Sequence, residues 1–353
     1  MKLIAAVLAS LALLCLAPVA QAAYDPIGSG TTKLTLDKSF LALLQKHGVK
    51  LEAKKPAKRK GASISIPVSG GEMDPLIEKG TIEQEGVLVF KRGKISVPFK
   101  KLTLKTKRSA IQAKVGGSQL KVATAKRISF TRRGFGSVFG AVDLGLSAKV
   151  VTRLNKKLRL GKALKEGQVI GSFTSTTQPL TTTILGQNRA TLVLDPAFVA
   201  KLNSRFVSLN PISPAELSAG PVFSLPIVAG GAIAPDGIQG TLRTGGAIEF
   251  LQQGSGAQIF QQEFWLDLAT RATSAEMEVR PLGPGKLGRI EVLAMGQTSV
   301  SSDPGARTIS VSGAPLALST LTADTLDQTF AENKDVFVPG EVFGTLSFTA
   351  QGQ

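Results

Sequence analysis

One pattern of residues occurs twice along this chain, in the same order and at nearly constant spacing. The segment Gly80–Thr81–Ile82 returns as Gly240–Thr241–Leu242, 160 positions later. Chance matches would not preserve the order of so many positions, so the sequence predicts a tandem duplication of one domain. The other matches pair Leu34, Leu36, Asp37 and Phe40 with Leu192, Leu194, Asp195 and Phe198, Pro67 and Val68 with Pro226 and Ile227, Phe90 with Phe250, and Gly167, Val169 and Gly171 with Gly340, Val342 and Gly344.

The chain is long enough for two such copies preceded by an export signal. Its 353 residues exceed two domains of about 150 residues each. Met1 and Lys2 precede the apolar run 3–17, which is shorter than the ~20 residues of a membrane anchor. Ala20 and Ala22 supply the small residues of a cleavage site. We therefore predict a signal peptide at 1–22 and a secreted, extracytoplasmic protein that associates with the cell envelope.

The domain boundaries follow from the repeat and from composition. The first copy is predicted over 23–178 and the second over 184–353. A stretch rich in serine and threonine runs through 172–183 and is interrupted by Pro179. Such composition is typical of a connecting segment, so we place the linker at 179–189, overlapping the start of the second copy.

Each copy has mainly the pattern of β-strands. Leucines alternate with polar residues along 101–107, and Ile128 and Phe130 alternate with polar residues along 127–131, which is typical of half-buried strands. One helix is expected to begin after Asp37 and to end at Gly48, and another to cover about 147–160; their counterparts begin after Asp195 and cover about 321–332. The expected fold is all-β, sandwich or barrel-like, with two short helices per domain.

The residue census excludes several kinds of chemistry. Cys15 lies within the predicted signal, and the rest of the chain retains one histidine, His47, one tyrosine, Tyr24, and one tryptophan, Trp265. Disulfides, thiolate metal sites, cysteine nucleophiles and chemistry that needs two histidines cannot be built from this set. Trp265 lies between Phe264 and Leu266 and is expected to pack in the core or on an edge strand. We therefore predict a non-catalytic binding or structural protein without a metal or cofactor.

Positive charge is concentrated in the first copy. Residues 1–185 carry a net charge of +22 and residues 186–353 a net charge of −5, which together make the +17 of the chain. A surface of this kind attracts polyanions, so an anionic envelope polymer is the predicted partner; nucleic acid is not expected outside the cell. A solubility role for these lysines is the alternative. The candidate polyanion-binding residues are Lys54, Lys55, Lys58, Arg59, Lys60, Lys101, Lys105 and Lys107, the last three expected on one strand face.

The motifs together resemble a known family. Ser39–Phe40 in the first helix, Pro67–Val68–Ser69–Gly70–Gly71, Gly80–Thr81–Ile82 and the closing Gly167-x-Val169-x-Gly171 are similar to the Htaa domain of exported haem-uptake proteins. The resemblance implies a β-rich fold, a cell-envelope setting and haem iron held by a tyrosine of the first helix and a histidine of a following strand. Those positions fall near Leu43 and Leu202, and near Lys91 and Arg92, in this sequence.

Two other functions stay open at this stage. Haem capture by a divergent site would use His47, a methionine or a lysine, although a histidine just before Gly48 also suits the carbonyl end of a helix. A hydrolase of an envelope glycan or ester could use a carboxylate pair or the motif Ser118-x-x-Lys121. The glycines at 116 and 117 favour a turn followed by a strand for that motif.

Overall fold

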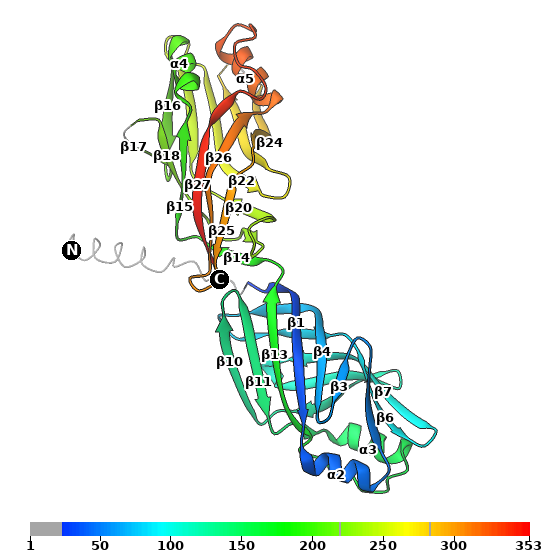
Figure 1. The fold of residues 1–353 in the computed structure, drawn as a ribbon. Coiled ribbons are helices and arrows are strands. Elements are labelled where there is room, and N and C mark those ends of the chain that lie inside the picture. Colours follow the sequence, from blue (N-terminus) through cyan, green and yellow to red (C-terminus); the bar gives the residue numbers. More distant parts are fainter. Residues whose placement is uncertain (1–22, 219, 282–283) are drawn as a thin grey trace, which may run out of the picture.

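The structure is a computed structural model that describes residues 23–218, 220–281 and 284–353. The predicted signal peptide at 1–22 lies outside the described residues. These residues form two large sheets in which every strand pairing is antiparallel, and each sheet builds one domain (Figure 1). The fold is mostly β with short helices, as the sequence predicted. Along the described part of the chain, no helix has the length and apolar character that crossing a membrane requires.

The first domain is built from the elements up to β13. Its sheet runs in the order β10-β11-β13-β1-β4-β5-β7-β8-β9-β12, while β3 pairs with β4 and β2 joins through β6 to β7. Its strands are β1 (Asp25–Leu36), β2 (Lys50–Lys54), β3 (Lys58–Lys60), β4 (Ser63–Asp74), β5 (Lys79–Gln84), β6 (Val87–Arg92), β7 (Ile95–Lys105), β8 (Ala110–Val115), β9 (Ser118–Thr124), β10 (Arg127–Arg133), β11 (Gly136–Val142), β12 (Gly145–Leu146) and β13 (Gly171–Pro179), and its helices are α2 (Lys38–Lys46), the short η2 (Thr106–Arg108) and α3 (Ala148–Lys157).

The second domain follows after a very short connection. Its sheet runs in the order β17-β18-β15-β27-β14-β19-β20-β22-β23-β24-β26-β25, with β21 and β16 attached through β22. Its strands are β14 (Thr182–Leu185), β15 (Arg189–Leu194), β16 (Val207–Ile212), β17 (Glu216–Ser218), β18 (Val222–Pro226), β19 (Ala232–Ile233), β20 (Gly240–Arg243), β21 (Ala247–Gln252), β22 (Gln258–Asp267), β23 (Ala272–Arg280), β24 (Gly285–Met295), β25 (Ser299–Asp303), β26 (Thr308–Leu318) and β27 (Val342–Gly352), and its helices are α4 (Pro196–Ser204) and α5 (Thr320–Phe330).

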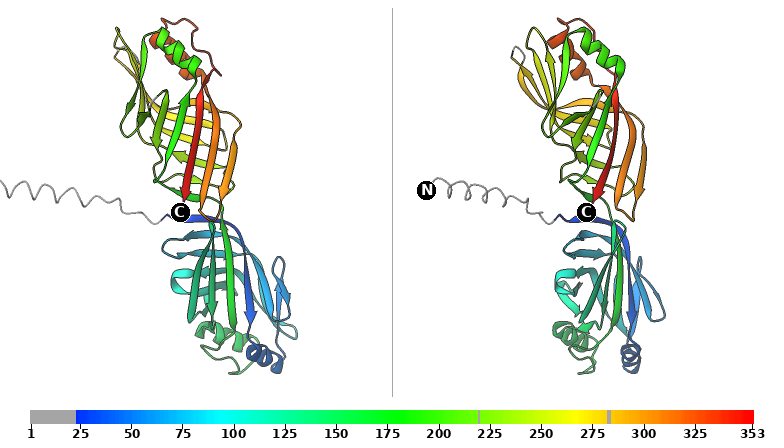
Figure 2. Two further views of the ribbon diagram at one scale, coloured as in Figure 1. Left: turned by 60° about the vertical axis from the view of Figure 1, so that its left-hand side comes forward. Right: turned by 90° about the vertical axis from the view of Figure 1, so that its left-hand side faces the viewer.

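The helices begin where the sequence predicted. The carboxylate of Asp37 accepts hydrogen bonds from the backbone N–H groups of Ser39 and Phe40, at 2.8 and 3.2 Å, and Asp195 caps α4 in the same way. These side chains satisfy N–H groups that a helix leaves free in its first turn. Both pairs of helices lie at the ends of the molecule that are farthest from the junction between the domains (Figures 1 and 2).

The duplication is visible in matching structural details. The N–H of Asp37 donates to the carbonyl of Ile170 at 3.0 Å, and the N–H of Asp195 donates to that of Phe343 at 2.9 Å. The strands β7 and β22 each bulge at a residue with positive φ, Lys101 at 49° and Glu263 at 52°. Matching bulges on corresponding strands provide a residue-by-residue register between the two copies.

Two sequence expectations about strands are corrected. The serine- and threonine-rich stretch at 172–183 is mostly β13, and of the linker placed at 179–189 only residues 180–181 and 186–188 lie outside strands, because β14 covers Thr182–Leu185. Gly171, Phe173, Ser175 and Thr177 of β13 are buried, which is the alternation of a strand with one face toward the core. The strand at 127–133 exists as β10, but Ile128 is 52% exposed, because β10 is the last strand at one end of the sheet order.

Candidate functional site

The first group of predicted basic residues lies on the β2–β3 segment, two consecutive strands of which β2 pairs with β6 and β3 pairs with β4. Lys54 ends β2, Lys55 lies in the turn, and Lys58 and Lys60 belong to β3; all four side chains are exposed. None of the salt bridges among the described residues involves them. The β2–β3 segment therefore presents four ammonium groups to solvent without a carboxylate partner.

Arg59, the fifth member of this group, has a structural role. Its guanidinium donates to the carbonyl of Gly61 at 2.9 Å and to the carbonyl of Leu51 on β2. The side chain thus ties β3 to β2, because a guanidinium can donate several hydrogen bonds in a fixed geometry. We assign Arg59 to the support of the β2–β3 segment.

The second predicted group is only partly on one strand face. Lys101 is exposed at the bulge of β7, beside Glu83 and Glu85 in an open hollow of about 450 Å³. Lys105 is half-buried, and its ammonium donates to the hydroxyl of Thr81 at 3.3 Å. The prediction that Lys101, Lys105 and Lys107 share one strand face is wrong for Lys107, because β7 ends at Lys105 and Lys107 lies on η2.

A pair of lysines that the alternation did not identify lies beside this group. Lys100 on β7 and Lys114 on β8 are directly opposite each other in the register, and both are exposed. Neither takes part in a salt bridge among the described residues. The bulge places Lys100 and Lys101 on the same exposed side, whereas strict alternation would put one of them in the core.

A third basic area surrounds the start of α3. Lys121, Lys126 and Lys149 line a groove of about 380 Å³ that also includes Glu166. The hydroxyl of Ser147 donates to the carbonyl of Lys121 and makes no capping hydrogen bond to the helix. The first N–H groups of α3 therefore add partial positive charge to three ammonium groups.

His47 stands at the end of α2. It is the C-cap residue of the helix, and its backbone N–H donates to the carbonyls of Leu43 and Leu44 at 3.2 Å. Its side chain is half-buried. Among the described residues, no group of three histidine, cysteine, aspartate or glutamate side chains could hold a metal ion.

The residues at the positions that the family resemblance assigns to haem iron do not fit that group. Leu43 and Leu202 have no ligand atom, and both pack in or against the hydrophobic cores. Arg92 donates to the carbonyls of Leu158 and Arg159, at 2.8 and 2.6 Å, and so closes the end of α3. Lys91 lies 4.0 Å from the carboxylate of Glu52. These side chains are engaged in the fold, so we derive no haem chemistry from them.

Trp265 is neither in the core nor on an edge strand. It lies half-buried on β22, which pairs with β20, β21 and β23. The guanidinium groups of Arg243 and Arg289 lie 4.3 and 4.0 Å from the ring centroid. Arg289 also pairs with Glu276 at 3.3 Å and with Glu263 at 3.6 Å. The indole is thus occupied by protein cations.

The motif Ser118-x-x-Lys121 has the structure that its glycines indicated. Ser118 is the first residue of β9 and pairs with Val115 across the turn at Gly116 and Gly117. Lys121 pairs with Gln112 farther along the same strand. The turn-and-strand interpretation is therefore confirmed.

Several solved structures are similar to this protein. The C-terminal domain of HtaA from Corynebacterium glutamicum matches with 17% sequence identity and a TM-score of 0.37, over 48% of this chain and 98% of that one. The N-terminal domain of HtaA matches with 12% identity and a TM-score of 0.36, over 48% of this chain and 99% of that one. The haem-binding protein HtaB of the same organism matches with 9% identity and a TM-score of 0.36, over 49% of this chain and 95% of that one.

The resemblance to Htaa domains that the sequence indicated is thus found again among solved structures. No protein-family model matches the sequence, and neither does any curated protein.

Proposed function

We propose that the protein is an exported, non-catalytic binding protein of the cell envelope whose first domain contacts an anionic polymer. The observation that carries the proposal is the opposed pair Lys100 and Lys114 on neighbouring strands. Like charges directly opposite each other destabilise a sheet by up to ~1 kcal/mol. An anionic ligand that lies between the two ammonium groups would remove this repulsion and release its own counterions.

The position of this pair argues against a purely protective role. Lysines often keep the edge of a sheet from pairing with another chain, and this role fits Lys58 and Lys60, since β3 pairs only with β4. By contrast, β7 and β8 are interior strands with partners on both sides. Lys100 and Lys114 therefore do not protect an edge, and general solubility would not require two lysines at one cross-strand position.

The shortage of carboxylates strengthens the attraction for anions. In the described part of the first domain, the salt bridges are Lys91 with Glu52 and Arg127 with Asp143. Most other cations of a region with net charge +22 are consequently free to interact with a polymer. A flexible polyphosphate chain can contact all three basic areas, because its backbone bends from one area to the next.

The experiment is a binding titration of the purified protein with linear polyphosphate at several salt concentrations. Affinity should fall steeply with salt, with a log-log slope of magnitude about 3 or more. The variant Lys100→Gln/Lys114→Gln should reduce the slope by about 1 to 2, one for each phosphate contact removed. A second variant, with Lys54, Lys55, Lys58 and Lys60 replaced by glutamine, tests the β2–β3 segment separately.

The matched control is Lys286→Gln/Lys334→Gln, which removes two exposed lysines of the second domain. This control should bind polyphosphate with the slope of the wild-type protein. Full-strength binding and an unchanged slope in both first-domain variants would contradict the proposal and leave solubility as the role of these lysines.

A further inference from the structure

The core of the first domain contains an apolar cavity of about 50 Å³. It lies between the sheet and the two helices, since Phe40 of α2 and Leu154 of α3 contribute to its lining. Leu102 of β7 and Ile170, just before β13, line it as well. Protein cores rarely leave voids larger than a water molecule, and a water requires only about 10–15 Å³ of such space together with polar partners. The cavity is therefore large for a core and unsuited to water over most of its wall.

One part of the wall is polar. The amide nitrogen of Gln84 donates to the hydroxyl of Thr32 at 2.9 Å, and this hydroxyl lies 2.9 Å from that of Ser175. All three side chains are buried. The wall of the cavity therefore carries polar side chains, those of Gln84 and Thr32, at this place.

The cavity is separated from the surface by a thin wall at this polar part. Gln84 and Leu102 line both the cavity and the open hollow of about 450 Å³ beside Lys101. The wall is bordered by two irregularities, the bulge of β4 between Val68 and Gly70 and the bulge of β7 between Lys100 and Thr103. Bulges interrupt the ladder of hydrogen bonds. Gln84 and Leu102, which are paired across β5 and β7, therefore form the boundary between the hollow and the cavity.

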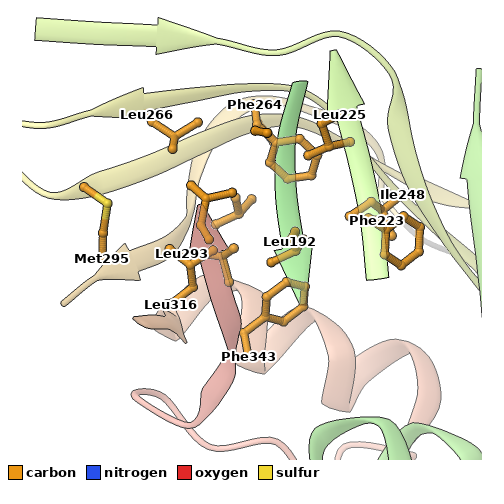
Figure 3. Packing of buried hydrophobic residues seen from close by; sticks show 14 of the residues in the cluster. Leu192, Phe223, Leu225, Ile248, Phe264, Leu266, Leu293, Met295, Leu316 and Phe343 are labelled. Atoms are coloured by element: carbon orange, nitrogen blue, oxygen red, sulfur yellow. The ribbon is translucent and has the colours of Figure 1, made fainter. Parts of the chain in front are cut away.

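The second copy has larger side chains at two positions that correspond to the wall of this cavity. The matching bulges at Lys101 and Glu263 align Leu102 with Phe264, and the matching hydrogen bonds from Asp37 and Asp195 align Ile170 with Phe343. Both phenylalanines are buried in the core of the second domain, where their rings approach Leu192 from two sides (Figure 3). The first copy therefore has the smaller side chain at each of these two positions of the cavity wall.

We propose that the first domain binds the end of a single alkyl chain in this cavity, with a neutral polar head group in the hollow beside Gln84. A volume of about 50 Å³ accepts a few methylene groups and excludes a broad ring system. The hollow contains Ser69, Thr103 and Gln119 together with one lysine and two glutamates. Hydroxyl and amide side chains with mixed charges suit an uncharged, hydroxyl-rich head group better than an anion.

The test uses the full protein with two probes, octyl glucoside below its critical micelle concentration and 1-hexanol, in a methyl NMR titration. Both probes should give saturable shifts of first-domain methyl groups. In the wild-type protein, the terminal methyl of octyl glucoside should give nuclear Overhauser contacts to Leu154 and Ile170. Contacts confined to residues of the hollow, or shifts that do not saturate for either probe, would overturn the proposal.

A variant in which larger side chains fill the cavity tests its role, and we call it the filled variant. It uses the phenylalanines that the second copy has at the matching positions. Leu102→Phe/Ile170→Phe places the two rings of the second copy in the first, and affinity for both probes should fall about tenfold or more, as expected for the loss of about two buried methylene groups. The control Leu76→Phe adds a ring at a side chain that is 62% exposed and should bind as the wild type does. Unchanged affinity in the filled variant would assign the binding to another place and refute the proposal.

Discussion

The carboxylate of Asp25, on the first strand of the first domain, accepts two hydrogen bonds from Thr183, on the first strand of the second domain. The backbone N–H and the hydroxyl of Thr183 both lie 2.8 Å from one carboxylate oxygen, and the hydroxyl of Thr182 lies 3.1 Å from the other. Asp25 is buried. The two domains are thus joined by a buried polar contact as well as by the short connection at 180–181.

The first prediction is that this junction makes stability depend on pH. Burial raises the pKa of Asp25 above its usual value of 3.8, although the hydrogen bonds from Thr183 act in the opposite direction. Between 3.8 and the raised value, the folded protein binds more protons than the unfolded chain, so the free energy of unfolding falls as pH rises through this window. Asp25→Asn should remove this fall, because an amide does not titrate in this range. The junction should be kept, because the amide oxygen and nitrogen can still bond to Thr183 and Thr182.

The measurement is urea unfolding of both proteins between about pH 4 and pH 7. The stability of Asp25→Asn relative to the wild type should increase as pH rises. Asp143→Asn, at a partly exposed carboxylate of the first domain, is the control and should keep the wild-type pH dependence. If Asp25→Asn lost stability with rising pH as much as the wild type, Asp25 would not be the group responsible.

A second prediction concerns Phe135, which links the two cores. Phe135 lies between β10 and β11 of the first domain, yet it is 4% exposed and packs with the hydrophobic cluster of the second domain. Phe135→Ala should weaken the interaction free energy between the two domains by about 3 kcal/mol. Calorimetry should then show two separate unfolding transitions, where the wild type shows more closely coupled ones. The control Phe130→Ala removes a ring of the same hairpin that packs only on the first core, and it should lower the first-domain transition alone.

The third prediction is that each domain folds by itself when the chain is divided at the observed connection. Residues 23–180 and 181–353 each retain their own core, apart from the contact of Phe135. A second fragment beginning at 184 should be less stable than one beginning at 181, because it loses the pairing of Thr182 and Thr183 with Ile233 and Ala232. Tryptophan fluorescence can follow this fragment, since the only tryptophan of the chain is Trp265. Failure of both fragments to unfold cooperatively would contradict the two-domain interpretation.

The sequence predicted those features that depend on local patterns. The caps at Asp37 and Asp195 and the stops of the first helices depend on residues within one turn, and all are present in the structure. The repeat was also visible, because glycines and aspartates are needed at fixed points of the fold. The all-β class followed from short alternating runs.

The features that the sequence did not predict depend on contacts between distant segments. The β7 bulge shifts the alternation after Lys100, so Lys114 opposite it could not be found from spacing. The cavity is lined by Leu102 and Ile170 among others, residues that are far apart in the chain and come together only in the folded domain. The junction network of Asp25 and Thr183 spans the two domains for the same reason.

The last prediction compares one backbone position in the two copies. Gly48 after α2 and Phe206 after α4 both have positive φ, 65° and 57°. Glycine adopts this conformation freely, whereas other residues lose about 1 kcal/mol or more. Phe206 is also 74% exposed, so its ring contributes little packing in return. Phe206→Gly should therefore stabilise the second domain by about 0.5–1 kcal/mol.

The reciprocal change, Gly48→Phe, should destabilise the first domain by a similar amount, since a Cβ at this position meets no neighbour within 4 Å and the effect comes from the backbone alone. Urea unfolding followed by Trp265 fluorescence reports the second domain, and calorimetry separates the first. A fall in second-domain stability for Phe206→Gly would show that the exposed ring makes a stabilising contact that outweighs the strain of its backbone.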